Sequence, residues 1–200
     1  MTVEAVPDLY PSEPLPVRLM NTVWASREGV HDSLSTVAQL QQWARQCGVQ
    51  PSTGLTRADI DRARSLRDAL RRLAADQLGD RRTGAVSDRF TPGEALDVLN
   101  DFLATCVPEV RVEGGSGLRR DWRSSVSGFD RQLVALALEA SDLLVKGQSA
   151  LGACHGPGCV LYFARVPARR EWCSAGCGNR ARVARHYRRH SEAPADESTG

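Results

Sequence analysis

Apolar side chains recur at helical spacing through most of the first 148 residues. Leu66, Leu70 and Leu73 lie on one face of a segment whose other positions are densely charged, as in a surface helix that packs on a core. The segment 129–145 is apolar nearly all round, which is typical of a helix at the centre of a core. The predicted helices are 36–47, capped by Ser35, 57–78, capped by Thr56, 92–105, which begins at Thr91-Pro92-Gly93-Glu94, and 129–145.

Alternating patterns predict a few strands between these helices. Residues 16–25 alternate loosely and are predicted to form a strand. Val110 and Val112 alternate before the turn at residues 114–117, and Leu118, Arg120 and Trp122 alternate after it. This pattern predicts a β-hairpin. The fold class is therefore α+β: a mostly helical body with a small antiparallel sheet, followed by a cysteine-rich ribbon that ends in a basic helix.

Composition divides the chain into four parts. Prolines and acids make residues 1–14 an expected flexible tail, and 15–148 form the body. Residues 149–190 hold the cysteine cluster, and 191–200 are an expected acidic, disordered tail. The start lacks the basic and apolar segments of a signal peptide, and no apolar run is long enough to span a membrane. We therefore expect a cytoplasmic protein with no membrane partner.

The cysteines of the third part have the spacing of a metal site. They follow the pattern Cys154-x4-Cys159-x13-Cys173-x3-Cys177, in which two close pairs can bring four sulfurs to one tetrahedral zinc ion. A set of Cys173, Cys177, His186 and His190 is the alternative. Only eight residues separate Cys177 from His186, whereas such fingers use roughly twelve, and this set would leave Cys154 and Cys159 without a role. We expect one zinc ion per chain, held by the four thiolates.

Charge is concentrated at the same end of the chain. The net charge is +2, but residues 151–190 contain eight arginines and a single acid, Glu171. In a helix after Cys177, Arg182, Arg185 and Arg189 share one face, with Arg188 nearby and Val183 and Tyr187 opposite. The apolar face is expected to dock on the ribbon and the arginines to face outward, where guanidinium groups suit phosphate. The predicted nucleic-acid-binding residues are Arg182, Arg185, Arg188 and Arg189, and Arg180 is expected to brace the finger.

Sequence motifs in both halves resemble a known pair of domains. Trp172-Cys173-Ser174 and Cys177-Gly178-Asn179-Arg180, after Cys154-x4-Cys159, resemble the bacterial CGNR zinc finger. In the body, Asn21-Thr22-Val23, His31-Asp32-Ser33-Leu34, Leu66-Arg67-Asp68-Ala69-Leu70 and Trp122-Arg123 resemble the ABATE domain usually found before that finger. Arg165 stands where family members commonly have an acid, and the last cysteine pair is one residue tighter.

The resemblance implies a bacterial, stress-induced transcription regulator with zinc on Cys154, Cys159, Cys173 and Cys177 and with DNA as its partner. The body would then sense a small-molecule effector or form a homodimer. A zinc-folded RNA-binding or protein-interaction adaptor is the alternative, and an enzyme with its site in the body is a third. No nucleotide-binding loop, nucleophile elbow or helical metal motif is present, so we expect no enzyme. The candidate ligand-pocket residues are Asn21, Thr22, Trp24, Asp32, Trp122 and Arg123.

Overall fold

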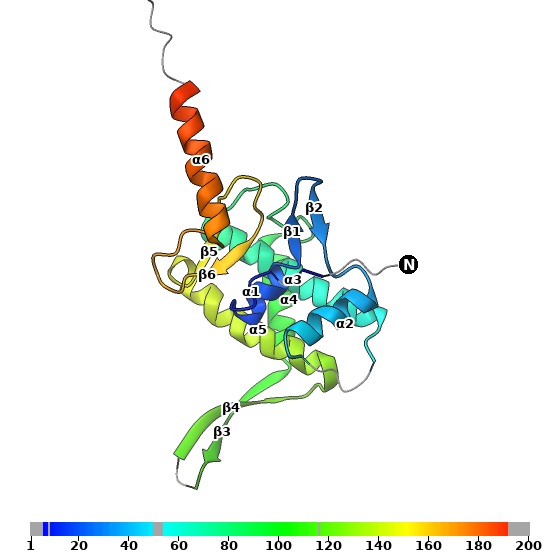
Figure 1. Cartoon of the computed structure of the whole chain (residues 1–200). Helices are drawn as coiled ribbons and strands as arrows, with labels where there is room; N and C mark the ends of the chain where they lie inside the picture. The colour runs from blue at the N-terminus through cyan, green and yellow to red at the C-terminus, as the bar shows by residue number, and fades with distance from the viewer. Residues whose placement is uncertain (1–5, 8, 50–53, 116, 192–200) are drawn as a thin grey trace, which may run out of the picture.

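The computed structural model describes residues 6–7, 9–49, 54–115 and 117–191 (Figure 1). Of the expected acidic tail at 191–200, Ser191 ends the last helix, and residues 192–200 lie outside this part of the chain. The elements in chain order are α1 (Leu15–Met20), β1 (Val23–Ala25), β2 (Val30–Asp32), α2 (Val37–Gln46), α3 (Arg57–Leu78), α4 (Pro92–Leu103), β3 (Cys106–Glu113), β4 (Gly117–Ser124), α5 (Gly128–Lys146), η1 (Gly147–Ser149), β5 (Leu151–Ala153), β6 (Tyr162–Ala164) and α6 (Ala175–Ser191).

The core lies around α3, which packs against α1, α2, α4 and α5. Leu66 and Leu70 of α3 and Leu133 and Leu136 of α5 are all buried in it. Both apolar patterns predicted from the sequence are therefore core faces. Three of the helices begin with a capping box. Thr56 caps α3 and Thr91 caps α4 as predicted, while α2 is capped by Thr36, one residue after the predicted Ser35.

The predicted strand over residues 16–25 is mostly wrong. Leu15–Met20 form the helix α1, and only Val23–Ala25 are extended. Pro16 occupies the first turn of α1, where its missing N–H costs nothing. Val17, Leu19 and Met20 are all buried, because a short helix that is enclosed on several sides buries residues all round it.

Three separate antiparallel pairs make up the strands. β1 pairs with β2, β3 with β4, and β5 with β6. The β3–β4 pair is the predicted hairpin and projects from one end of the body, while α6 projects from the other end (Figure 1). The mixed architecture is the one that the sequence predicts, a helical body with small sheets, followed by the ribbon β5–β6 and a terminal helix.

The first residues described are packed, in contrast to the expected flexible tail at 1–14. Val6 is 4% exposed and belongs to the core of the body. Leu9 and Tyr10 pack against the cysteine cluster, and Glu13 is buried. The acidic and proline-rich composition predicted disorder here. The apolar side chains are buried because the folded body and the cysteine-rich segment together provide a surface on which they pack.

Candidate metal centre and basic helix

Four cysteines from three parts of the fold meet at one point. Cys154 follows β5, Cys159 follows a tight turn, Cys173 precedes α6, and Cys177 lies in its first turn. Their sulfur atoms all lie within 4.8 Å of one another. The Cys173 Sγ atom is 3.8 Å from that of Cys159 and 3.3 Å from that of Cys177. Zinc–sulfur bonds of about 2.3 Å in a tetrahedron place sulfurs about 3.8 Å apart, so the cluster has the dimensions of a zinc site.

The thiols of the cluster favour a cation among them. Hydrogen bonds from the Cys159 and Cys173 thiols lower the pKa of Cys154. The hydrogen bond between Cys154 and Cys173 contributes most to raising the pKa of Cys173, and burial raises it further. One thiolate is thus stabilised at the expense of its neighbours, because several negative charges in a buried cluster repel one another. A bound divalent cation removes that repulsion, which fits the four residues to zinc.

Nearby donors also point at the sulfurs. The Cys173 amide donates to Cys154 Sγ at 3.4 Å, and Arg180 Nη2 donates to Cys177 Sγ at 3.0 Å. Such bonds favour the thiolate form that binds metal. Arg180 therefore has the bracing position expected from the sequence.

Two glycines allow the segments around the cluster to approach closely. A Cβ atom on Gly156 would lie 2.9 Å from the Cβ atom of Cys177, and one on Gly178 would lie 3.1 Å from Cδ1 of Trp172. The first distance is shorter than side-chain contacts tolerate, and the second would require Trp172 to shift. The glycine of the Cys177-Gly178-Asn179-Arg180 motif thus packs on Trp172, while Asn179 accepts a hydrogen bond from Arg182.

The body holds the first cysteine pair directly. Arg82 Nη1 donates to the carbonyl oxygen of Cys159 at 2.8 Å and also to that of Cys154. Asp80, whose side chain is fully buried, orients this guanidinium at 2.7 Å and accepts the Tyr162 hydroxyl at 3.0 Å. Arg82 is thus a functional residue that the sequence analysis missed. Its motif is an arginine two residues after an aspartate, which is too common to single out.

More contacts join the cysteine-rich segment to the body. The buried Arg71 donates to the carbonyl oxygens of Met20 and Val160, at 2.8 and 3.2 Å. Glu13 accepts the Ala164 amide at 2.8 Å and pairs with Arg170 at 2.6 Å. The cysteine-rich segment therefore packs on the surface of the body.

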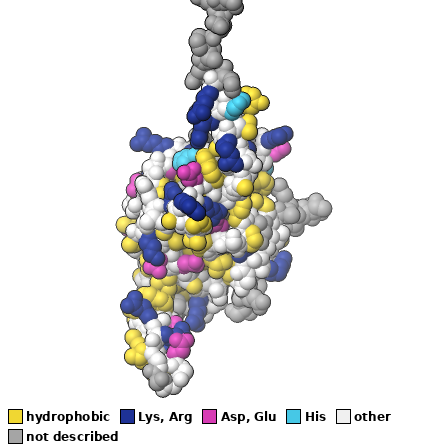
Figure 2. Space-filling view, turned by 60° about the vertical axis from the view of Figure 1, so that its left-hand side comes forward, with side chains coloured by type: hydrophobic (Ala, Val, Ile, Leu, Met, Phe, Trp, Pro, Cys, Tyr) yellow, Lys and Arg dark blue, Asp and Glu magenta, His cyan; other side chains and the backbone are white. Residues whose placement is uncertain are grey.

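The arginine-rich helix projects beyond the cluster. Cys177 anchors its first turn, where Ser174 Oγ accepts the Cys177 amide at 3.2 Å. Arg182, Arg185, Arg188 and Arg189 are all exposed, and Figure 2 shows basic side chains gathered along this projecting end. The expected docking of the opposite face is wrong: Val183 is 54% exposed and Tyr187 70%. The helix extends away from the ribbon, so its distal turns have no surface to pack on.

The alternative ligand set with two histidines is not assembled. His186 is exposed on α6 and lies outside the cysteine cluster, and the side chain of His190 is outside the described part of the chain. Cys154 and Cys159 instead complete the set of four sulfurs. The geometry therefore agrees with one zinc ion and four cysteines.

The candidate ligand-pocket residues lie in two distant places. Asn21, Thr22, Trp24 and Asp32 come together where α1 leads into β1–β2. Trp122 and Arg123 lie on the projecting β4 strand. Trp24 stacks on His31, with ring centroids 4.3 Å apart, and donates to Ser33.

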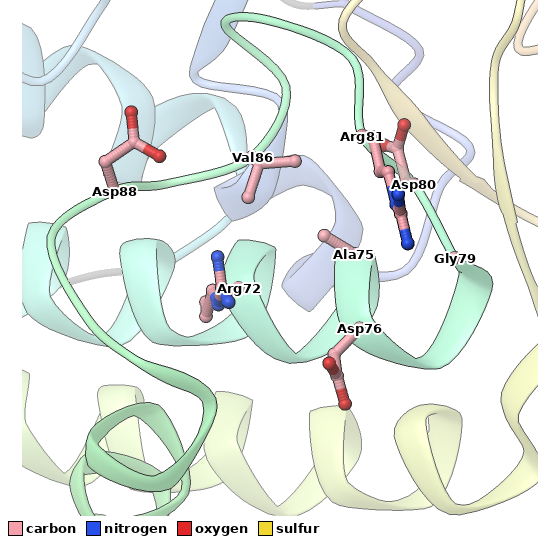
Figure 3. A pocket seen from close by; sticks show the side chains of 8 residues that line it. All are labelled: Arg72, Ala75, Asp76, Gly79, Asp80, Arg81, Val86 and Asp88. Atoms are coloured by element: carbon pink, nitrogen blue, oxygen red, sulfur yellow. The ribbon is translucent and has the colours of Figure 1, made fainter.

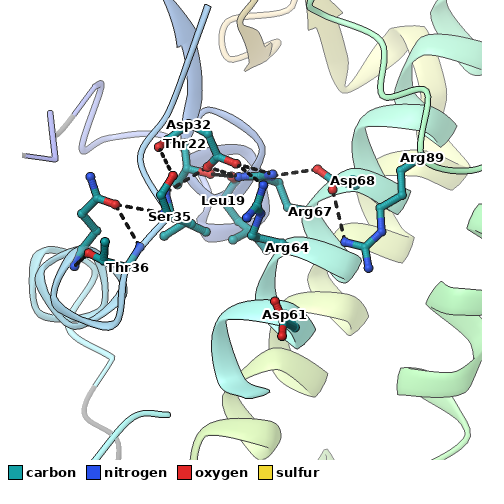
Figure 4. Close-up of polar contacts among 12 residues, drawn as sticks. Leu19, Thr22, Asp32, Ser35, Thr36, Asp61, Arg64, Arg67, Asp68 and Arg89 are labelled. Carbon is teal, nitrogen blue, oxygen red and sulfur yellow. Dashed lines mark hydrogen bonds and ion pairs between the residues drawn. The ribbon is translucent and has the colours of Figure 1, made fainter. Parts of the chain in front are cut away.

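Polar atoms of the first group bond within the chain (Figure 4). Asp32 accepts both Arg67 Nη1, at 2.6 Å, and Arg67 Nη2, at 3.0 Å, and it also pairs with Arg64. Burial alone would raise the pKa of Asp32, but the hydrogen bonds and charge of Arg67 outweigh it and hold this pKa below the ordinary value. Thr22 donates to the Leu19 carbonyl oxygen. These contacts join the β1–β2 pair to α3.

A hollow of about 470 Å³ lies between α3 and the loop that carries Arg82 (Figure 3). Arg72, Asp76, Arg81 and Asp88 line it together with Asp80. The Nε atom of Arg72 is buried there and has no acceptor among the described residues. Figure 3 shows the Arg72 and Asp80 side chains at different parts of this hollow.

Two family models match the chain over adjoining parts. The ABATE model, described as "Putative stress-induced transcription regulator", matches residues 13–147. The CGNR zinc finger model matches residues 150–190. No curated protein matches the chain significantly. Within the described residues, no helix is long and apolar enough to cross a bilayer. Since the first model covers more than half of the sequence and the second covers the cysteine cluster, the chain belongs to the ABATE family and carries a CGNR zinc finger.

Proposed function

We propose that the protein is a zinc-dependent, DNA-binding transcription regulator. The observation that carries the proposal is the exposed arginine face of α6 on a helix whose first turn is fixed by the cysteine cluster. A helix of 17 residues is about 25 Å long and about 10–12 Å wide. These dimensions fit the major groove, which is about 12 Å wide. Zinc supplies no chemistry here beyond fixing the base of the helix.

Arginine contacts to phosphate support this use of the helix. Each guanidinium can fork onto two phosphate oxygens, and Arg182, Arg185 and Arg189 are all exposed on the helix. Val183 and Tyr187, which are exposed on the other face, can contact base edges and thymine methyl groups. Both faces of the projecting helix thus have a role in a groove.

Filter binding on duplex DNA tests the proposal. We expect the wild-type protein to bind duplex DNA and the triple variant Arg182→Ala, Arg185→Ala, Arg189→Ala to lose most of that binding. The matched control removes the same charge from the body, through Arg27→Ala, Arg57→Ala and Arg81→Ala, all exposed. Equal losses in both variants would reduce the effect to net charge. Preference for single-stranded RNA over duplex DNA would favour the adaptor instead.

We place effector sensing in the body, at the hollow between α3 and the 79–88 loop. Arg72 lines the hollow, and its guanidinium charge suits an anionic group. Asp80 belongs to the wall of the hollow and also holds Arg82, which links this site to the cysteine loop. A thermal-shift screen of small carboxylic acids, repeated on Arg72→Gln, tests this site. A ligand that stabilises both proteins equally binds elsewhere.

A further inference from the structure

A short segment before the first helix, residues 9–13, contacts the metal centre at the second cysteine pair. Leu9 and Tyr10 pack against the apolar cluster that contains Cys173. Cys173 is only 2% exposed, so these side chains help to keep water from its sulfur atom. By contrast, Cys159 is half-buried and lines a hollow of about 490 Å³. The second cysteine pair is thus the more completely covered of the two.

The Tyr10 hydroxyl reaches one of the sulfur atoms directly. Its oxygen lies 3.8 Å from Cys173 Sγ, and the Ser174 side chain hydrogen-bonds the same hydroxyl. A metal-bound cysteine is a thiolate and has no proton to give. When zinc is bound, the hydroxyl is therefore the donor and the sulfur is the acceptor. Contacts of this kind orient a metal ligand and influence how tightly the metal is held.

The backbone of Tyr10 indicates that these contacts determine its position. Its φ angle is 63°, which lies in the left-handed region that a bulky residue rarely adopts. Such a conformation persists where the surrounding contacts fix it. The Glu13 amide closes a turn by donating to the Tyr10 carbonyl oxygen at 3.0 Å, with Pro11 at the second position that proline favours. The turn connects two residues that both contact the cysteine-rich segment.

Glu13 holds the same part of the metal centre through Arg170. The Glu13 carboxylate is buried and lies 2.6 Å from Arg170 Nη1. Arg170 in turn donates to the carbonyl oxygens of Trp172, at 3.0 Å, and Cys173, at 2.6 Å. Residues 165–174 contain no helix or strand. This loop therefore depends on such side-chain contacts to keep Cys173 in place.

We propose that residues 9–13 are a latch on the metal centre, which slows the release of zinc by holding Cys173 and the loop before it. Tyr10 orients the sulfur, and Glu13 fixes the loop. Arg82 from the body makes the corresponding contact with the first cysteine pair. Retention of the metal thus depends on residues before α1 as well as on the body. The latch does not depend on the proposed DNA binding, since it is measured without nucleic acid.

Release of zinc from the full, zinc-loaded chain to a chromogenic chelator tests the latch. Tyr10→Phe removes only the hydroxyl, and Glu13→Gln removes the charge while keeping the shape of the side chain. We expect each variant to release zinc about tenfold faster than wild type, because losing an outer contact to a metal ligand has effects of this order. Glu113→Gln, at an exposed site on β3, is the matched control and should release zinc at the wild-type rate.

A spectroscopic measurement separates this role from simple packing. With Co²⁺ in place of zinc, the thiolate-to-cobalt charge-transfer absorption reports the bonding of the sulfur atoms. Tyr10→Phe should shift this absorption, because one sulfur loses its hydrogen bond while the aromatic ring remains. Glu113→Gln should leave the absorption unchanged. Hydrogen exchange of α3 reports whether the body of each variant is as stable as that of wild type.

Three results would overturn the proposal. Either Tyr10→Phe or Glu13→Gln could release zinc at the wild-type rate, as they would if the metal leaves past Cys159. Tyr10→Phe could leave the cobalt absorption unchanged, which would mean that its hydroxyl does not act on the sulfur. Finally, release could be faster only in variants whose α3 also exchanges faster, which would show that unfolding of the body, not opening of the latch, is being measured.

Discussion

Asn21 and Tyr162 hold each other through two hydrogen bonds, although 141 residues separate them. Asn21 Nδ2 donates to the Tyr162 carbonyl oxygen, and the Tyr162 amide donates to Asn21 Oδ1, both at 3.0 Å. Asn21 ends α1 in the body, and Tyr162 begins β6 beside the cysteine cluster. The Asn21 side chain thus pairs with the Tyr162 backbone as a neighbouring strand would. It joins the two parts of the chain that the two family models match.

We expect Asn21→Ala to lower the free energy of unfolding by about 2–4 kcal/mol, because it leaves a buried N–H and a buried C=O without partners. Urea unfolding at neutral pH measures the change. Asn100→Ala, at an exposed site on α4, serves as the control and should change stability by less than about 0.5 kcal/mol. A similar loss in both variants would contradict a bridging role for Asn21.

Zinc should stabilise the whole chain. The protein should contain one zinc ion per chain with four sulfur ligands, measured by elemental analysis and X-ray absorption. Cys173→Ser should remove the ion and also weaken the body, because β5, β6 and the body share one core. Hydrogen exchange of α3 reports the body. Cys106→Ser, outside the cluster, should keep the zinc content of wild type. Nitrogen ligands at the zinc, or unchanged protection of α3 in Cys173→Ser, would contradict the prediction.

Arg82 should control how firmly the first cysteine pair is held. Arg82→Gln leaves the buried Asp80 carboxylate without its cation and frees the carbonyl oxygens of Cys154 and Cys159. We expect a loss of about 3 kcal/mol in unfolding free energy and faster zinc release to a chromogenic chelator. Arg81→Gln, an exposed neighbour, is the control for the loss of one charge. Zinc release at the wild-type rate in Arg82→Gln would show that the clamp has no role in metal retention.

The arginines of α6 should separate by function. If Arg182, Arg185 and Arg189 contact phosphates, log affinity for DNA should fall linearly with log salt, and each change to Ala should lower the slope by about one. Arg180 donates to Cys177 Sγ, so Arg180→Ala should leave the slope unchanged and weaken zinc binding. Filter binding across several salt concentrations measures the slopes. Unchanged slopes in the Ala variants of Arg182, Arg185 and Arg189 would mean that this face of the helix is only a solvated surface.

Acid should weaken the link between β1–β2 and α3. The folded state lowers the pKa of Asp32, so this carboxylate contributes stability above its unfolded pKa of about 3.9, and the contribution is lost as pH falls through the lower folded pKa. We expect Asp32→Asn to cost about 2 kcal/mol at neutral pH, with a smaller difference from wild type in acid. Urea unfolding between neutral pH and pH 3 measures this. Asp61→Asn, which breaks an exposed pair with Arg57, should cost less than about 1 kcal/mol.

The sequence predicted those features that depend on local pattern. The caps at Thr56 and Thr91, the apolar faces of α3 and α5, and the β3–β4 hairpin all follow from spacing within one element. The four-cysteine site could be predicted for the same reason, because the geometry of a metal site restricts the spacing of its ligands along the chain. These features need no knowledge of which segments meet in space.

The contacts between distant segments could not be predicted in this way. Val17 and Leu19 alternate as in a strand, and only the enclosure of α1 by α3 and α5 explains why a helix buries them. Arg71 and Arg82 look like two more charges on a solvated surface until the cysteine loop is placed against them. The exposure of Val183 and Tyr187 likewise depends on where the ribbon ends, which no periodicity records.

The clamp of Arg82 on the Cys159 loop limits how this finger can be engineered. Grafted onto another protein, the finger would lose three contacts with the body. These are the Arg82 guanidinium on the Cys159 carbonyl oxygen, the Asn21 side chain that pairs with Tyr162, and the Glu13 carboxylate that accepts the Ala164 amide. Chimeras that exchange the proposed DNA-binding part of α6 should therefore be joined after Arg180, where the helix leaves the rest of the molecule. Everything before that point would have to be transplanted as a whole.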